Sequence, residues 1–132
     1  MISRNVLDSL GFAGLVLGGA VAFKLAGALG LIPAQTAGHG FQVILGVMLA
    51  AYGNVIPKRL VRTLDPERAR RLQGVRRASG WAMTLAGLVY ALAWLATPEA
   101  VAFPVSITAV ALAGLVTLVG VVTGCLRPAV RT

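Results

Sequence analysis

Four long apolar segments, separated by short stretches that hold almost all of the charge, constrain this chain more than any other feature. They cover residues 9–32, 41–56, 79–96 and 104–126, and Lys24 is the only charged residue within them. A helix that crosses a bilayer needs about 20 apolar residues. The second segment falls short of that length, so we expect it to begin near Gly38 or to lie in a locally thinned bilayer. The pattern predicts an all-α integral membrane protein with one domain, residues 1–132, folded as a four-helix bundle.

The composition excludes most soluble classes of protein. Charged residues make up 12% of the chain, about half of the share that is usual in soluble domains. The formal net charge of +8 would suggest nucleic-acid binding in a soluble protein. However, no aromatic residue is interleaved with the central basic run, as stacking on a single strand would require. We therefore expect the partner of these cations to be a bilayer with anionic headgroups, and we expect no nucleic-acid partner.

The positions of the cations predict how the helices are oriented. Apart from Lys24, every Lys and Arg lies near the start, in the central run or near the end: Arg4, Lys58, Arg59, Arg62, Arg68, Arg70, Arg71, Arg76, Arg77, Arg127 and Arg131. The connections 33–40 and 97–103 contain no Lys or Arg. Because cationic loops stay in the cytoplasm, we expect a bacterial inner-membrane protein with both termini cytoplasmic. Its two helical hairpins would be parallel and joined by a basic cytoplasmic loop.

The central loop predicts a further helix over about residues 65–78. Asp65, Pro66 and Glu67 supply an N-cap acceptor, a first-turn proline and an acid near the positive end of the helix dipole. Leu72 and Val75 share one face of this helix, and its cations are Arg68, Arg70, Arg71, Arg76 and Arg77. Such a helix would lie along an anionic membrane surface or bind a cytoplasmic protein. Alternatively, it only fixes the topology.

Lys24 is the one cation that the orientation rule does not explain. In a helix ending at residue 32 it lies about 12 Å below the outer end, at a rise of about 1.5 Å per residue. One explanation is that the helix tilts or ends near Gly30, so that the lysine snorkels to the surface. The other is that Lys24 lines a cavity for an anion or a peptide, with Glu99 as its partner, the only acidic residue expected on that side.

Small residues recur three or four positions apart in all four apolar segments, as in Gly11, Gly14 and Gly18. Close approach of helix backbones at small residues drives association where lipid gives no hydrophobic drive. We expect most of them to pack helices within one chain. The alternative is a symmetric homodimer through Gly120 and Gly124.

The inventory of reactive residues argues against an enzyme. The only His, His39, lies in a stretch expected on the outer side, and the only Cys, Cys125, lies at the cytoplasmic end of the last segment. They would be about 30 Å apart, the thickness of a bilayer core. Metal-ligand clusters, phosphate loops and nucleophile elbows are absent from the sequence. We expect no catalytic residues, no metal and no cofactor.

A set of residues on either side of the central loop resembles the SdpI family of bacterial membrane proteins. The second segment ends Gly-Asn-x-x-Pro-Lys, and the third begins with arginines followed by Gly-Trp. The resemblance covers about residues 45–95, and the matching positions are Asn54, Pro57, Lys58, Arg62, Gly80 and Trp81. The best-known members give immunity to a secreted toxic peptide and hold a repressor at the membrane. The resemblance implies a tentative binding role for these residues.

Elementary chemistry gives Asn54 a second explanation. Pro57 has no N–H, so it leaves backbone carbonyls of the preceding turn without a donor. An amide three residues earlier could donate to them. On this explanation Asn54 is a structural cap.

Three functions are therefore expected. The first is a small binding or accessory protein of the SdpI-like kind with a cytoplasmic or membrane protein partner. The second is an anion channel or transporter that uses Lys24. The third is a structural subunit of a larger membrane complex.

The orientation makes a direct prediction. Because all cations but Lys24 lie at the expected cytoplasmic ends, a reporter fused after Thr132 should be active only if it is of the kind that works in the cytoplasm. A reporter fused within residues 97–103 should behave in the opposite way. Activity of a periplasm-only reporter after Thr132 would contradict the orientation.

Overall fold

The structure is a computed structural model that describes residues 4–58 and 65–126, without the side chains of residues 4, 5, 125 and 126. It consists of four long helices: α1 (Arg4–Ala28), α2 (Ala34–Val55), α3 (Pro66–Ala96) and α4 (Glu99–Leu126). One 3-10 turn, η1 (Ile56–Lys58), continues α2. All four helices are long and apolar enough to cross a membrane. The all-α fold with four apolar helices is thus confirmed.

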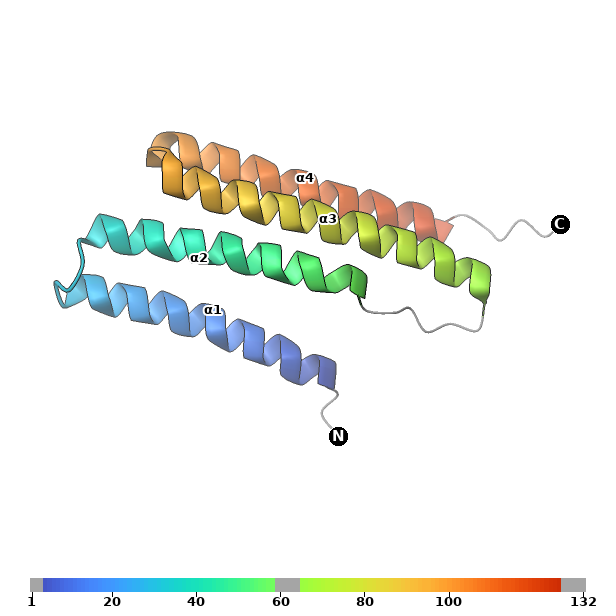
Figure 1. The fold of residues 1–132 in the computed structure, drawn as a ribbon, viewed down its shortest axis with the longest axis horizontal. Coiled ribbons are helices and arrows are strands. Elements are labelled where there is room, and N and C mark those ends of the chain that lie inside the picture. Colours follow the sequence, from blue (N-terminus) through green and yellow to red (C-terminus); the bar gives the residue numbers. More distant parts are fainter. Residues whose placement is uncertain (1–3, 59–64, 127–132) are drawn as a thin grey trace.

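The helices form two hairpins that point the same way. Figure 1 shows the α1–α2 and α3–α4 turns at one end of the molecule, here named the turn end, and the start of α1 at the opposite, open end. Within the described ranges α1 contacts α2, α2 contacts α3, and α3 contacts α4, whereas no other pair of these helices is in contact. The helices therefore follow one another in a row, and α1 and α4 lie at its edges.

The turns do not lie where the ends of the apolar segments predict them. α1 ends at Ala28, and Gly30 has a φ of 69°, a conformation that glycine adopts without steric cost. α2 begins at Ala34, seven residues before the apolar segment expected from residue 41. Residues 34–40 are more polar than that segment, so their composition alone predicts a loop. α2 thus has 22 residues, enough to cross a bilayer core.

α4 likewise begins before its expected start at Pro104, at Glu99, and Pro104 lies inside the helix. The backbone N–H groups of Val101 and Ala102 both donate to the carbonyl of Pro98 at 2.9 Å. Pro98, not Pro104, therefore precedes the first turn.

α3 is one continuous helix of 31 residues, or about 46 Å at 1.5 Å per residue. The helix expected along the membrane surface is its first part. Asp65 caps it as expected, with Oδ1 accepting from the backbone N–H of Glu67 at 2.9 Å and of Arg68 at 3.3 Å. The apolar face does not lie open to lipid, because Val75 packs against α4. A Cβ atom added at Gly120 would lie 3.1 Å from Cγ1 of Val75.

The contact between α2 and α3 is the tightest in the fold. A Cβ atom added at Gly46 would lie 2.6 Å from the backbone nitrogen of Ala91, and one at Gly87 would lie 2.6 Å from the carbonyl oxygen of Gly46. One at Gly53 would lie 2.6 Å from the nitrogen of Thr84. Real Cβ atoms do not approach this closely, so only glycine fits these positions. The expected packing of small residues within one chain is present at this interface.

The glycines in the first part of α1 do not take part in such packing. A Cβ atom added at Gly11, Gly14 or Gly18 would meet nothing within 4 Å. α1 instead touches α2 near its two ends, through Phe23 beside Gly40 and through the rings of Phe12 and Tyr52, whose centroids are 5.5 Å apart. The expectation that this stripe packs within the chain is wrong.

The glycine contact predicts a steep dependence of stability on one methyl group. Gly87→Ala places a Cβ against the backbone of Gly46 and Ala50, so it should lower the free energy of unfolding by about 1–3 kcal/mol, the usual cost of overpacking. The matched control is Gly114→Ala, whose Cβ meets nothing within 4 Å and which should leave stability unchanged or raised. Thermal unfolding in detergent measures both. Equal stabilities of the two variants would contradict the role of the interface.

Candidate functional site

The residues that carry the SdpI resemblance come together at the open end of the α2–α3 pair. A hollow of about 100 Å³ is lined there by residues of α2, η1 and α3: Gly53, Asn54, Pro57, Lys58, Gly80, Trp81 and Thr84. We name it the α2–α3 hollow. Five of the six matched positions line it, although they are separated by more than 20 residues in the sequence. The sixth, Arg62, lies outside the described residues.

Backbone geometry explains why glycine and proline meet here. A Cβ atom added at Gly80 would lie 2.8 Å from the carbonyl oxygen of Gly53 and 2.9 Å from Cγ of Pro57. α3 therefore passes directly over the proline ring of η1. This close approach forms the floor of the hollow.

Two polar side chains of α3 tie it to α2 beside the hollow. Gln73 donates from Nε2 to the carbonyl oxygen of Pro57 at 2.8 Å. Thr84 Oγ1 lies 2.8 Å from the carbonyl oxygen of Gly80 in its own helix and 3.3 Å from that of Ala50 in α2. The carbonyl of Pro57 lies beyond the end of α2, where helical donors are lacking, so the bond from Gln73 satisfies it.

Asn54 does not act as the cap that was considered for it. Its side chain is exposed and makes no hydrogen bond with any described residue. The bond from Gln73 goes to the carbonyl oxygen of Pro57 itself, not to the carbonyls of the preceding turn. The Asn54 amide and the exposed Lys58 ammonium are thus open to a ligand at the hollow. The sequence did not predict Gln73 or Thr84 here, because single uncharged polar residues give no periodic signal. Their hydrogen bonds become visible only once the ends and the pairing of the helices are known.

Trp81 forms the rim of the hollow, with 66% of its surface exposed. An indole beside a lysine at the end of an apolar helix is typical of the membrane interface. The α2–α3 hollow therefore combines an amide, an ammonium group and an aromatic face. That set can bind an acceptor group and an apolar group together.

The other expected site residues are separated. Glu99 begins α4, and Lys24 lies in α1, a helix that contacts only α2. No ion pair joins these two side chains in the described structure. Lys24 instead lines a larger hollow between α1 and α2. It is four residues from the end of α1, or about 6 Å, so the expected depth of about 12 Å is wrong and its stem can reach the surface.

The basic face of α3 begins beyond the α2–α3 hollow. Arg68, Arg70, Arg76 and Arg77 are exposed, whereas Arg71 is half-buried and lies 4.0 Å from Glu67. Leu72 is half-buried, and Val75 faces α4. The exposed arginines give this part of α3 a strong positive charge.

His39, near the turn end, differs from its expected position. His39 lies in α2, not in a loop, and its ring meets that of buried Trp94 edge-on, with centroids 5.2 Å apart. The side chain of Cys125 lies outside the described residues. Among the described residues, no group of three or more His, Cys, Asp or Glu side chains could hold a metal ion.

Gly120 and Gly124 are also engaged within the chain. Cβ atoms added to them would lie 3.1 Å and 3.4 Å from Val75. A homodimer through these glycines would therefore have to replace or share the Val75 contact.

Comparison of the chain with protein families, with curated proteins and with solved structures finds no match. The resemblance to the SdpI family consequently rests on the residues named above and on nothing wider.

The hydrogen bonds around the α2–α3 hollow predict a difference between two threonines. Thr84→Val removes a hydroxyl that reaches α2, so it should lower the free energy of unfolding by about 0.6 kcal/mol and at most about 1.7 kcal/mol. Thr123 bonds only carbonyls of its own helix, so Thr123→Val should have no such effect. Thermal unfolding of both variants in detergent checks this. A loss in Thr123→Val as large as in Thr84→Val would remove the interhelical bond from the explanation.

Proposed function

We propose that this protein is a small membrane binding or accessory protein of the SdpI-like kind, which recognises a protein partner through the α2–α3 hollow. The single observation that carries the proposal is the convergence of Asn54, Pro57, Lys58, Gly80 and Trp81 on one hollow. These residues were grouped by their resemblance alone, without regard to space. Their meeting at one place is what a shared binding role requires.

The chemistry of the hollow suggests how a partner would bind. The Asn54 amide and the Lys58 ammonium supply donors for backbone carbonyls or a carboxylate of a peptide. Trp81 supplies an exposed apolar face of the kind that dominates binding energy at interfaces. The exposed arginines of α3 would add long-range attraction for an acidic partner.

Sidedness belongs to the same proposal. The open end would face the cytoplasm of a bacterial cell, since Lys58 and the arginines of α3 lie there. The partner would then be a cytoplasmic protein or the cytoplasmic end of a membrane protein. Immunity to a toxic peptide or membrane signalling would act through that contact.

The alternatives expected from the sequence have weaker support. An anion channel through one chain would need Lys24 at the centre of the fold, but α1 lies at the edge of the row of helices. Liposomes containing the purified protein should therefore show no flux of chloride, fluoride or nitrate above background. Selective flux that disappears in Lys24→Leu would favour the channel instead.

A structural subunit would bind its neighbours along the open faces of α1 or α4, not through the α2–α3 hollow.

A site-specific crosslink tests the binding function. A photoreactive phenylalanine analogue in place of Trp81 should give a discrete protein adduct in cells, because the side chain rims the hollow. The same analogue in place of Leu115, an exposed residue of α4, is the control and should give none. The Trp81 adduct should be lost in Asn54→Leu and kept in Val89→Leu, which alters a side chain of another hollow. A protein adduct that forms equally from both positions, or that ignores Asn54→Leu, would contradict the proposal.

A further inference from the structure

A hollow with two polar side chains lies between α1 and α2, near the turn end. It has a volume of about 660 Å³ and is lined by residues 20–28 of α1 and 34–42 of α2. That volume lies within the range of about 300–1,000 Å³ that is usual for small-ligand sites. We name it the α1–α2 hollow. It exists because α1 touches α2 at Phe23 beside Gly40 and at Gly27 beside Ala37, and leaves space around these contacts.

Both polar side chains of this hollow can donate hydrogen bonds to a ligand. They are those of Lys24 and Gln42. Gln42 Oε1 accepts a hydrogen bond from the hydroxyl of Tyr90, and the amide nitrogen can donate to a ligand. Lys24 has an ammonium group, which only donates. The hollow is thus built for a ligand that offers acceptors and carries negative charge.

The remaining walls are apolar. Val21, Phe23 and Phe41 stand among alanines and glycines. A free inorganic anion would leave these walls without a partner and would give up its hydration for one cation and one amide. A ligand with an anionic head and a hydrocarbon chain would satisfy both parts.

The position of Lys24 near the end of α1 favours a membrane lipid over a soluble ligand. The lysine lies about one helical turn from the end of α1. In a bilayer that these helices span, its ammonium group would reach the level of the lipid phosphates. From there the hollow continues toward the middle of α1, as far as Ala20.

We propose that the α1–α2 hollow binds one acidic phospholipid, with its phosphate on the Lys24 ammonium and part of an acyl chain against Val21, Phe23 and Phe41. Gln42, oriented by Tyr90, donates to the phosphate or to an ester carbonyl. The site lies at the opposite end of α2 from the α2–α3 hollow and does not depend on a protein partner there. It requires only that the helices lie in a bilayer.

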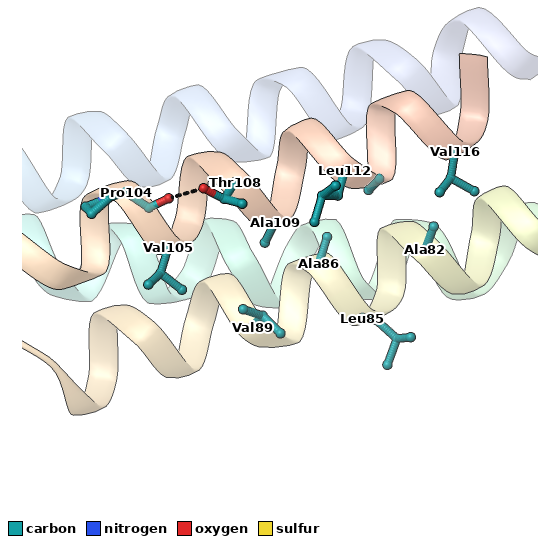
Figure 2. A pocket seen from close by; sticks show the side chains of 11 residues that line it. Ala82, Leu85, Ala86, Val89, Pro104, Val105, Thr108, Ala109, Leu112 and Val116 are labelled. Carbon is teal, nitrogen blue, oxygen red and sulfur yellow. Dashed lines mark hydrogen bonds between the residues drawn. The ribbon is translucent and has the colours of Figure 1, made fainter. Parts of the chain in front are cut away.

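Two other hollows were weaker candidates. The groove of Figure 2, between α3 and α4, is lined by apolar side chains and by Thr108, whose hydroxyl bonds the carbonyl of Pro104 at 2.8 Å. It offers no group that would distinguish one lipid chain from another. The hollow beside Tyr52 contains Asp8, which is engaged elsewhere. Neither of these two hollows is lined by a cation, whereas the α1–α2 hollow is lined by Lys24.

The test compares lipids that differ in headgroup charge. Native mass spectrometry of the full chain in detergent would count bound phosphatidylglycerol and phosphatidylcholine at matched concentrations. Wild type should retain one phosphatidylglycerol in preference to phosphatidylcholine. Lys24→Gln should weaken that preference about fivefold, the effect of about 1 kcal/mol per cation near a lipid headgroup. The control is Lys24→Arg, which keeps the positive charge at this position and should leave the preference unchanged.

A second pair of variants tests the apolar part without touching a charge. Gly38 lines the hollow, and a Cβ atom there meets nothing within 4 Å, so Gly38→Leu would fill the space while strengthening the helix. It should abolish the retained lipid even though Lys24 is intact. Gly114→Leu, on the open side of α4, is the matched control and should retain the lipid.

The outcomes separate the possible ligands. Loss of the retained phosphatidylglycerol in both Lys24→Gln and Gly38→Leu, but in neither control, supports the site. An unchanged preference in Lys24→Gln overturns it, as does retention in Gly38→Leu. If the protein retained glycerol 3-phosphate, which has the phosphate without the acyl chains, as well as it retains phosphatidylglycerol, the hollow would be an anion site. That result would contradict the proposal of a lipid site. A stable dimer of wild type without bound lipid would show that a second copy covers the hollow instead. None of these results bears on the crosslink from Trp81.

Discussion

The backbones of α2 and α3 approach so closely that no side chain fits between them, and the rest of the fold depends on this contact. Gly46 and Gly53 are seven residues apart, as are Gly80 and Gly87, so each pair lies on one face two turns apart. Where lipid removes the hydrophobic drive for association, such packing and the hydrogen bonds that cross it hold helices together. Gln73, Thr84 and Tyr90 of α3 all reach α2 from this interface. The central pair is thereby fixed, and α1 and α4 pack onto its outer sides.

That contact also creates the candidate binding site. The α2–α3 hollow forms where the paired helices end, because Gly80 lets α3 pass over Pro57 and leaves Asn54, Lys58 and Trp81 at its edge. A side chain at position 80 would push η1 away and open the hollow. A structural role and a functional role of Gly80 and Pro57 are thus compatible. The same two residues shape the backbone and position the groups that a ligand would meet.

Much of the fold could be predicted from the sequence, because helices in lipid must satisfy their own backbone and so appear as long apolar stretches. The four helices and the Asp65 cap follow from that constraint and from local chemistry. Their ends could not be placed from prolines, since Pro98 and Pro104 fit a first turn equally well and only the fold selects Pro98. The small residues were visible, but their partners were not: Gly87 is enclosed and Gly14 is open, although both occur at similar spacings. The resemblance grouped the residues of the α2–α3 hollow, whereas Gln73 and Gln42 gave no signal because a lone amide fits a loop, a cap or a lipid-facing surface.

The two hollows share α2 as a wall, and the way α2 is held keeps them independent. α3 fixes α2 along its length, through Gln42 near the turn end and through Pro57 at the open end. α1 touches α2 alone, so a change in its tilt alters the hollow around Lys24 and leaves the glycine contact intact. A lipid between α1 and α2 would therefore act on the stability and position of α1. It would contact none of the groups around Trp81, because the two hollows lie at opposite ends of α2.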